Sequence, residues 1–207
     1  MQYEEKKFTI PTLEGISQKS VEEHIGLYGG YVKNFNAVTA LAGKLMQDDA
    51  AGNALAIAEL MRRRSFEWGG MRLHELYFAQ FELASDAPED TGKPGVVPTT
   101  GALAAAITAQ YGNVDTLVQE IRQVAMLRGP GWAVLYFDPI AKQFLVGFSE
   151  EQHIGHFASL PIILALDVWE HAFLLDYGAT GRAKYIDAFF KNLNWNVVEE
   201  RFVSATK

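Results

Sequence analysis

Residues 160–172 read LPIILALDVWEHA, and this stretch changes character at Asp167. Its first half is a run of Ile and Leu behind a proline, which is typical of a buried β-strand. Its second half places a carboxylate at the end of that run and His171 four residues later. Because a chain turns where a strand ends, both side chains can face one centre. A buried carboxylate is unfavourable unless it is paired or coordinated, so the spacing predicts either a ligand pair or a capping aspartate with a surface histidine.

The sequence on either side of this stretch predicts a small antiparallel sheet. Apolar runs at residues 132–137 and 144–148 flank an Asp-Pro turn at residues 138–139, which is a hairpin signal. The run at residues 161–168 adds a third strand. All three strands lie in the C-terminal half of the chain.

The other segments have a helical pattern. Apolar residues recur at helical spacing at residues 20–46, 53–83, 99–111, 114–127 and 183–202. The fold class is therefore predicted to be α+β, with an N-terminal antiparallel helical hairpin followed by a C-terminal domain that has a small three-stranded antiparallel sheet and flanking helices.

Residues 86–98 read DAPEDTGKPGVVP, and their prolines, glycines and acidic residues predict a linker or a long loop. We therefore place an N-terminal domain at residues 1–90 and a C-terminal domain at residues 91–207. The histidines at residues 24 and 74 lie in the first part, and Asp167 and His171 lie in the second, so a metal site formed by all four is expected between the two.

Composition excludes several classes of protein. The 207 residues are 49% hydrophobic and 21% charged, which excludes disorder over most of the length. The net charge of −7 disfavours nucleic acid and anionic membranes as partners. The absence of cysteine excludes disulfides, thiolate zinc sites and iron–sulfur clusters, so any metal must be held by His, Asp and Glu. With no long apolar segment in the sequence, we expect a cytoplasmic protein.

Two of the five histidines begin apolar stripes at helical spacing. The stripes are His24, Leu27, Tyr28 and Tyr31 in the first helix and His74, Tyr77, Phe78 and Phe81 in the second. A buried imidazole needs a hydrogen-bond partner or a metal, and for one histidine alone a backbone carbonyl is the simpler partner. Two such histidines on facing helices favour a cation between them. With Asp167 and His171 they form a set of three nitrogens and one oxygen, which suits iron, manganese or zinc.

Further motifs occur in a fixed order along the chain. They are FTIPTLEG at residues 8–15, YVKNFN at 31–36, GG at 69–70, HELYF at 74–78, GPGW at 129–132, DVWEHA at 167–172 and NW at 194–195. In this order they resemble the iron/manganese superoxide dismutases, and the resemblance covers nearly the whole chain. It implies that His24, His74, Asp167 and His171 hold one manganese or iron ion, with water or hydroxide as a further ligand. It implies dismutation of superoxide to dioxygen and hydrogen peroxide.

The resemblance also implies roles for residues around the metal. Tyr31 is similar to the gateway tyrosine at the end of the solvent path, and Trp132 and Trp169 are similar to the walls of the metal pocket. Arg182 is similar to the arginine that attracts superoxide despite the negative net charge. Glu170 resembles the glutamate that crosses a homodimer interface to the partner's ligand histidine. The implied assembly is a homodimer or a tetramer.

The sequence departs from the family pattern at the interface. Tyr31 follows His24 by seven residues rather than the usual eight, although a regular helix still places both on nearly the same face. Tyr28 and Leu174 stand where the family has a histidine and a tyrosine that are hydrogen-bonded across the interface. We expect apolar packing there, or different docking of the subunits. Lower turnover, or an altered pH profile, is the predicted consequence.

The choice of metal depends on which amide contacts the coordinated solvent. Iron-type members usually have a glutamine four residues before the second ligand, where this chain has Gly70. Gln152 is therefore predicted to bond the coordinated solvent, with His153 as the alternative. This arrangement favours manganese or use of either metal over strict iron. His156 has no assigned role and is predicted to be a surface residue.

Two other functions remain open at this point. One is a metal-binding relative with reduced or no activity and an altered dimer interface, which the missing contact at Tyr28 and Leu174 suggests. The presence of all four ligands argues against it. The other is a hydrolytic zinc site, since three histidines and one aspartate also bind zinc. No general base stands beside the ligands in the sequence to support it.

Overall fold

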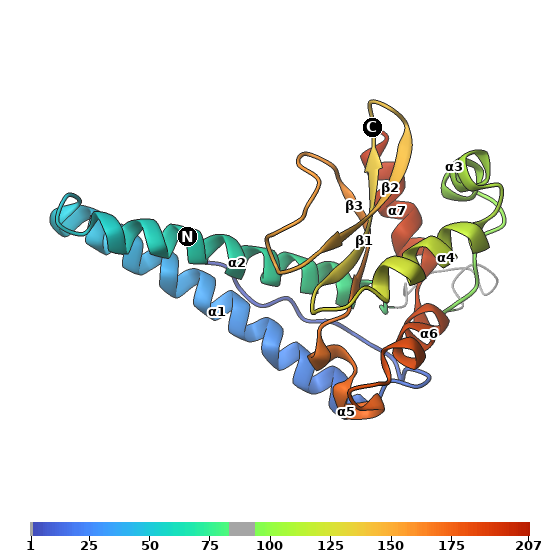
Figure 1. The fold of residues 1–207 in the computed structure, drawn as a ribbon, viewed down its shortest axis with the longest axis horizontal. Coiled ribbons are helices and arrows are strands. Elements are labelled where there is room, and N and C mark those ends of the chain that lie inside the picture. Colours follow the sequence, from blue (N-terminus) through green and yellow to red (C-terminus); the bar gives the residue numbers. More distant parts are fainter. Residues whose placement is uncertain (1, 83–93) are drawn as a thin grey trace.

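The computed structural model describes residues 2–82 and 94–207. Helices α1 (Gln18–Asp49) and α2 (Ala54–Ala79) form a long hairpin that projects from the rest of the molecule (Figure 1). The other elements are α3 (Ala102–Tyr111), α4 (Val114–Ala125), β1 (Trp132–Asp138), β2 (Gln143–Ser149), β3 (Ile162–Asp167), the 3-10 helix η1 (Glu170–Ala172), α5 (Leu174–Tyr177), α6 (Arg182–Asn192) and α7 (Trp195–Ala205). The predicted α+β class is confirmed, whereas most of the predicted linker and the boundary at residue 90 lie outside the described residues.

The hairpin is buried only near its base. Ser17 caps α1, because its side-chain oxygen accepts a hydrogen bond from the Ser20 amide at 3.1 Å. From there the buried face of α1 includes His24, Tyr28 and Val32. Beyond Val32 the only buried residue of α1 is Ala42, so the distal part of the hairpin projects into solvent.

The sheet has the strand order β2-β1-β3 and is antiparallel throughout. Its central strand, β1, is buried along nearly its whole length. The register places Trp132 opposite Asp167 of β3 and also opposite Ser149 of β2. One end of the sheet therefore brings together the start of β1, the end of β3 and the loop that follows β2.

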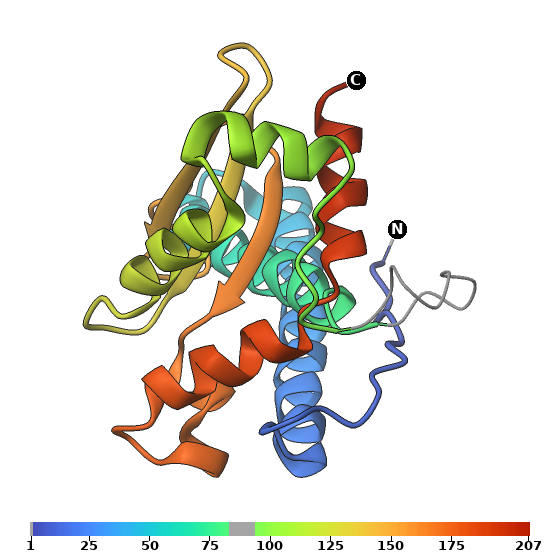
Figure 2. The ribbon, with the colours of Figure 1, turned by 90° about the vertical axis from the view of Figure 1, so that its right-hand side faces the viewer.

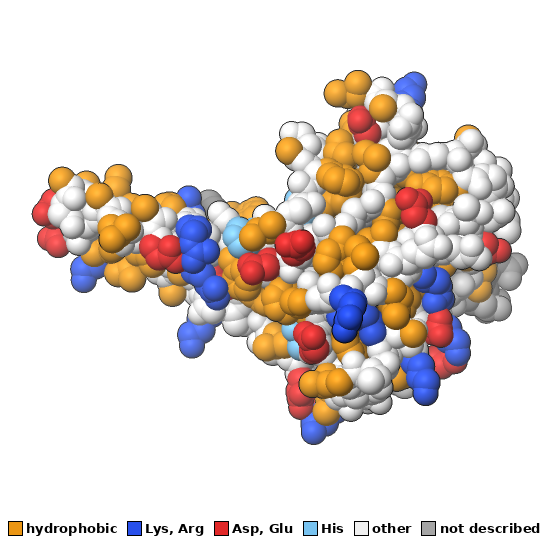
Figure 3. All heavy atoms as spheres, viewed as in Figure 1, with side chains coloured by type: hydrophobic (Ala, Val, Ile, Leu, Met, Phe, Trp, Pro, Cys, Tyr) orange, Lys and Arg blue, Asp and Glu red, His pale blue; other side chains and the backbone are white. Residues whose placement is uncertain are grey.

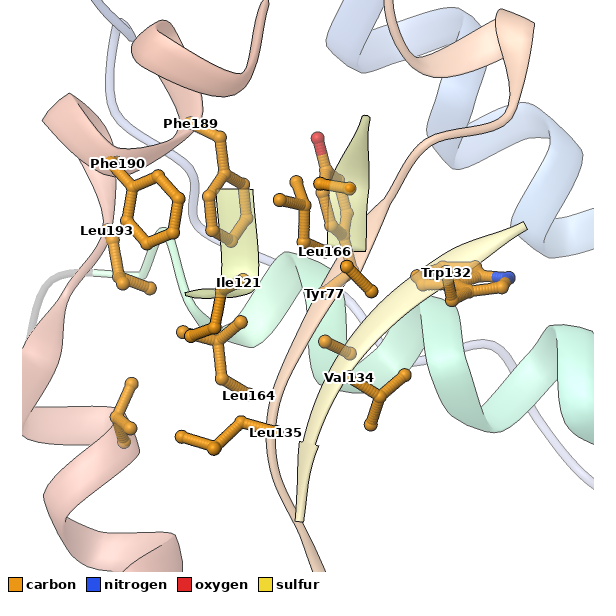
Figure 4. Packing of buried hydrophobic residues seen from close by; sticks show 14 of the residues in the cluster. Tyr77, Ile121, Trp132, Val134, Leu135, Leu164, Leu166, Phe189, Phe190 and Leu193 are labelled. Carbon is orange, nitrogen blue, oxygen red and sulfur yellow. The ribbon is translucent and has the colours of Figure 1, made fainter. Parts of the chain in front are cut away.

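Helices cover both sides of the sheet. Helix α4 contacts β1 and β2, whereas α2 and α7 contact β3 (Figure 2). Figure 4 shows the core between these layers, with side chains of α6 and the following residue facing those of α4 and β3. The labelled residues there include Ile121, Leu164, Phe189, Phe190 and Leu193. Burial of these apolar side chains is the main favourable contribution to folding.

The free edge of β3 is covered by side chains instead of a fourth strand. The Gln80 amide donates to the Ala165 carbonyl at 2.8 Å and accepts from the Ala165 N–H at 2.8 Å, as a neighbouring strand would. Arg201 of α7 donates to the Gln80 side-chain oxygen at 3.1 Å and to the Leu76 carbonyl at 2.7 Å. These bonds fasten α2, β3 and α7 to one another.

The C-terminal helical region differs from its prediction. Residues 183–202 were expected to be one helical stretch, but the chain forms two helices with a break at Leu193 and Asn194. Leu193 has an extended backbone, and the Asn194 side chain caps α7 by accepting from the Asn196 amide at 3.1 Å. Asn194 is a favourable N-cap residue, so its identity is the local signal for the break. The short elements η1 and α5 were not predicted.

We predict that Gln80→Leu destabilises the protein by about 3 kcal/mol, because two buried backbone groups of Ala165 lose their partner at roughly 1–3 kcal/mol each. Chemical denaturation measures the change in unfolding free energy. Gln47→Leu is the matched control, since Gln47 is exposed on α1 and its effect should stay within about 0.5 kcal/mol. Equal effects of the two substitutions would show that Gln80 does not secure the edge of the sheet.

Candidate metal centre

Four side chains from four elements meet at the base of the hairpin. His24 comes from α1, His74 from α2, Asp167 from the end of β3 and His171 from η1. One donor atom from each lies within 4.8 Å of the other three. The Nε2 atoms of His171, His24 and His74 are 3.1, 3.2 and 3.6 Å from the same Asp167 oxygen, Oδ2. The two histidines of the facing helices and the Asp167–His171 pair after the third strand thus come together, as expected from the sequence.

Hydrogen bonds orient these side chains toward one centre. His74 Nδ1 lies 2.7 Å from the Gly70 carbonyl and so carries the proton, which leaves Nε2 with a free lone pair. That Nε2 is buried and has no hydrogen-bond partner among the described residues. On Asp167, Oδ1 accepts a hydrogen bond from the Trp169 amide at 2.8 Å. An unpaired imidazole nitrogen beside a buried carboxylate oxygen fits a bound iron or manganese ion, which nitrogen and oxygen donors of this kind bind.

Burial and mutual charge set the protonation of the four groups. Burial, reinforced by neighbouring His24, lowers the pKa of His74 to about 3. Burial also lowers the pKa of His24. Burial alone would raise the pKa of Asp167, but the charge and hydrogen bond of His171 outweigh it and hold that pKa below its usual range. At His171 the charge of Asp167 outweighs burial and raises the pKa. Neutral imidazole and ionised carboxylate are the forms that bind a metal, so among the three histidines only His24 and His74 are shifted toward the binding form.

A hydrogen-bonded chain of three side chains adjoins this cluster. The Gln152 Nε2 donates to the Tyr31 hydroxyl at 3.0 Å, and the Trp132 Nε1 donates to the Gln152 Oε1 at 3.0 Å. The Tyr31 ring lies 5.0 Å from the His74 ring. Burial, followed by the charge of Asp167, raises the pKa of Tyr31 to about 12. Tyr31 therefore keeps its proton at neutral pH.

Two adjacent glycines of α2 make this chain possible. A Cβ at Gly70 would lie 2.3 Å from the ring of Tyr31, and a Cβ at Gly69 would lie 1.8 Å from the Gln152 carbonyl oxygen. Real side chains do not approach so closely. Tyr31 and Gln152 can therefore reach their positions only because residues 69 and 70 have no side chain.

Aromatic side chains surround the cluster. The Trp132 ring meets His74 edge-on at 5.1 Å, and the Trp169 ring is stacked with His171 at 6.0 Å. The Tyr77 and Phe78 rings lie 4.9 and 5.0 Å from the His24 ring. Each of the two tryptophans therefore lies beside one of the candidate ligand histidines.

Arg182 and Glu170 lie outside this shell. Arg182 donates to the Leu127 carbonyl at 2.5 Å and the Gly129 carbonyl at 2.7 Å, and its guanidinium lies over the Phe173 ring. Glu170 is exposed beside His171 in the chain. Burial lowers the pKa of His171, but the charge and hydrogen bond of Asp167, with a smaller contribution from the charge of Glu170, outweigh burial and raise that pKa.

The two remaining histidines have different surroundings. His153 packs against the Phe66 ring at 5.7 Å, away from the chain of hydrogen bonds that contains Gln152. His156 was predicted to be a surface residue, and this is wrong: it is half-buried, 2.8 Å from the Tyr136 hydroxyl and 3.2 Å from both the Ser149 hydroxyl and the Gln152 carbonyl. These contacts hold the loop that carries Gln152.

The shortened spacing between His24 and Tyr31 fits a regular helix. Helix α1 is an uninterrupted α-helix through both residues. Tyr28 points into its own chain, where its hydroxyl accepts from the Lys6 amide at 2.8 Å and donates to the Glu75 carboxylate at 3.3 Å. Leu174 is 48% exposed. The family pattern has a histidine and a tyrosine at these two positions, hydrogen-bonded across the interface. This chain instead has a tyrosine that is bonded within its own subunit and a leucine at the surface.

Two residues that contribute to the site were not predicted from the sequence. Phe66 packs beside the Tyr31 ring at 5.9 Å. Its position eight residues before His74 places it on the same helix face, which is a signal that the sequence contains. Glu75, which is buried next to His74, binds Tyr28, Lys6 and Arg72 and so ties the N-terminal segment to the hairpin. The i,i+3 spacing on a helix relates Arg72 to Glu75, but no spacing rule relates them to Lys6 or Tyr28.

Comparison with known proteins identifies related chains. Residues 99–201 match the family model described as iron/manganese superoxide dismutases, C-terminal domain. The iron superoxide dismutase of Aquifex aeolicus is 34% identical over 199 residues, which cover 94% of this chain and 88% of the relative. That of Saccharolobus solfataricus is 33% identical over 211 residues, covering 97% and 96%. The manganese superoxide dismutase of Mycolicibacterium smegmatis is 31% identical over 211 residues, covering 97% and 95%.

We predict that Gly70→Ala displaces the Tyr31 ring and lowers stability by about 1–3 kcal/mol, as overpacking of a filled interior does. Thermal or chemical unfolding measures this loss, and tyrosine NMR reports the displaced ring. Gly30→Ala on α1 is the control, because a Cβ there meets nothing within 4 Å. It should be neutral or stabilising by up to about 1 kcal/mol. Similar results for both variants would contradict the close approach at Gly70.

Proposed function

The chain belongs to the iron/manganese superoxide dismutase family, and on this premise we propose that His24, His74, Asp167 and His171 hold its metal ion. The enzyme converts superoxide to dioxygen and hydrogen peroxide. The observation that carries the assignment of ligands is their convergence on one point, with the buried His74 Nε2 left unpaired. When bound, the metal supplies an electron acceptor for one superoxide and an electron donor for the next.

We propose manganese, or use of either metal, over strict iron. Gly70 supports this choice, because a glutamine there would begin with a Cβ in the space of the Tyr31 ring. Gln152 is then the amide that we propose bonds the coordinated solvent, and its hydrogen bond to the Tyr31 hydroxyl supports this role. The relatives include enzymes named for either metal, and availability in the cell also decides which ion is loaded.

We propose that Tyr31 holds and donates a proton at the site and that Gln152 orients its hydroxyl. The Tyr31 hydroxyl accepts the hydrogen bond from Gln152, so its own hydrogen is free to be donated elsewhere. Its raised pKa keeps that proton in place between turnovers. Trp132 fixes the Gln152 amide by donating to its oxygen, and together with Trp169 it would limit the access of water. His153, which packs on Phe66, is the alternative partner for the coordinated solvent.

Arg182 is the proposed local attraction for superoxide. Its two bonds to backbone carbonyls hold the guanidinium cation in place without neutralising it. A fixed cation near the site raises the local concentration of an anionic substrate even on a chain with a net charge of −7.

A homodimer is the proposed assembly. Leu27, Leu174 and Leu175 are 44, 48 and 45% exposed and surround a hollow of about 450 Å³ whose walls include His24 and His171. An exposed apolar surface around two candidate ligands favours cover by a second copy of the chain. The exposed Glu170 beside His171 is the residue proposed to reach the partner's ligand.

A tetramer would need a second surface, and the projecting hairpin offers exposed hydrophobic side chains at Leu41, Met46 and Leu55 (Figure 3).

In the part of the chain that the structure covers, no helix is long and apolar enough to cross a membrane. The cytoplasmic location stays a prediction.

We expect the protein purified from metal-defined media to carry about one redox-active ion per chain, and His171→Ala to lose both metal and activity, because a three-ligand site binds more weakly. Elemental analysis and a superoxide assay across neutral to alkaline pH measure both. His153→Ala is the control and should keep its metal, since His153 is not among the four. A stoichiometric metal without activity would instead support the metal-binding relative, and metal retained in His171→Ala would overturn the assignment of ligands.

We predict that Leu174→Glu weakens the homodimer by about tenfold or more, because a carboxylate would be buried in an apolar interface. Sedimentation velocity over a range of concentrations measures the change. Ile140→Glu is the matched control, because Ile140 is 93% exposed at the turn between β1 and β2. A wild-type chain that is monomeric at all concentrations, or equal dissociation of both variants, would contradict this interface.

A further inference from the structure

A sizeable cleft lies outside the metal cluster. It encloses about 540 Å³ between one face of α2 and the loop that joins β2 to β3. Helix α2 contributes Arg64, Trp68 and Arg72, which lie one turn apart, and the loop contributes His153 and His156. None of the four candidate metal ligands lines it. A volume of this size is typical of small-molecule sites.

The charge of this cleft is opposite to that of the chain. Arg64 and Arg72 line it, and within the described residues no Asp or Glu does so, although the whole chain has 25 acidic and 18 basic residues. Arg72 donates to Glu75 at 2.6 Å, but Glu75 also pairs with Lys6 at 3.1 Å. Two cations thus share one carboxylate there. Arg64 has no acidic partner within ion-pair distance among residues 2–82 and 94–207.

Aromatic and aliphatic side chains form another part of the lining. The Trp68 and Phe35 rings lie 5.3 Å apart, and the Arg72 guanidinium is placed over the Trp68 ring at 4.5 Å. Leu73, Leu76 and Ile162 complete the apolar part. An inorganic anion would leave these surfaces unused, and a neutral aromatic molecule would leave Arg64 unpaired. A molecule that has both an anionic group and a planar ring matches both parts.

One wall of the cleft belongs to the loop that holds Gln152. Gln152 lines the cleft, and its backbone rests directly against Gly69 of α2. From this position the Gln152 side chain reaches Tyr31 and Trp132. His156, which also lines the cleft, is 3.2 Å from the Gln152 carbonyl. A molecule bound in the cleft would therefore contact the backbone that positions Gln152.

We propose that this cleft binds an organic anion with an aromatic ring, with the anionic group at Arg64 and the ring beside Trp68, and that its occupant alters turnover through the Gln152 loop. The second part rests on the proposed role of Gln152. The first part does not depend on the metal or on activity.

The test is calorimetric titration of the full metal-loaded chain with naphthalene-2-sulfonate as the probe. We expect saturable binding at one site per chain, weakened about tenfold in Arg64→Gln, as loss of a charged hydrogen bond predicts. Arg62→Gln is the matched control: it removes the same charge from the neighbouring position, where Arg62 pairs with exposed Glu59 and does not line the cleft. Its affinity should equal that of the wild type. The neutral naphthalene-2-sulfonamide should bind about tenfold more weakly than the sulfonate.

Equal affinity of Arg64→Gln and Arg62→Gln, equal affinity of the two probes, or absence of saturable binding would each overturn the site. The probe should also change wild-type turnover at saturation, and about tenfold more probe should be needed for the half-maximal effect on Arg64→Gln. Specific binding without any change in turnover would overturn the coupling to Gln152. Calorimetry reports binding of the probe whether or not the chain is active. A chain that binds the probe but has no superoxide dismutase activity would therefore contradict the proposed function and leave the binding site intact.

Discussion

The Asp167 carboxylate is completely buried, and three imidazoles approach one of its oxygens within 3.6 Å. An ionised carboxylate is this far from water only where compensating groups surround it. Those groups come from opposite ends of the chain: His24 and His74 from the hairpin, and His171 from the segment after the sheet. The junction between the hairpin and the sheet is therefore fixed at the point where the redox metal would bind. Without a cation, the unpaired His74 nitrogen would remain an unfavourable feature of the core.

The surroundings of this cluster depend on close approach of the backbone as much as on side chains. Gly69 and Gly70 allow the Gln152 loop and the Tyr31 ring to touch α2, so that Tyr31, Gln152 and Trp132 form one hydrogen-bonded chain. Trp132 is the other end of this hydrogen-bonded chain, and the register of β1 places it opposite both Asp167 and Ser149. Ser149 in turn binds the carbonyls of the loop at Glu151 and Ile154. Sheet register and helix glycines thus act together to place one amide.

The surface divides between substrate attraction and assembly. Superoxide is an anion and the chain is acidic overall, and for this reason we proposed Arg182 as a fixed local cation that attracts it. The leucines beside His171 are exposed where the family has a hydrogen-bonded contact, and Tyr28 has turned inward to hold the N-terminal segment. Apolar contact between subunits can replace a hydrogen bond in stability, but it cannot carry a proton. This difference is the physical basis for expecting altered turnover.

The sequence by itself determined the α+β class, the hairpin, the three strands and the four residues that converge, because periodicity and residue chemistry are local properties. It also indicated Gln152 over His153. It did not determine the break at Asn194, where a single cap residue competes with a continuous apolar pattern, or the half-buried position of His156. Only the tertiary structure decided that Tyr28 points to Lys6 and Glu75 and that Gly70 makes room for Tyr31. It also decided that two arginines of α2 line a cleft to which the described residues contribute no acidic side chain. Each of these depends on atoms that are distant in the chain and adjacent in space, and the packing of α2 against α1 and the sheet loop sets those distances.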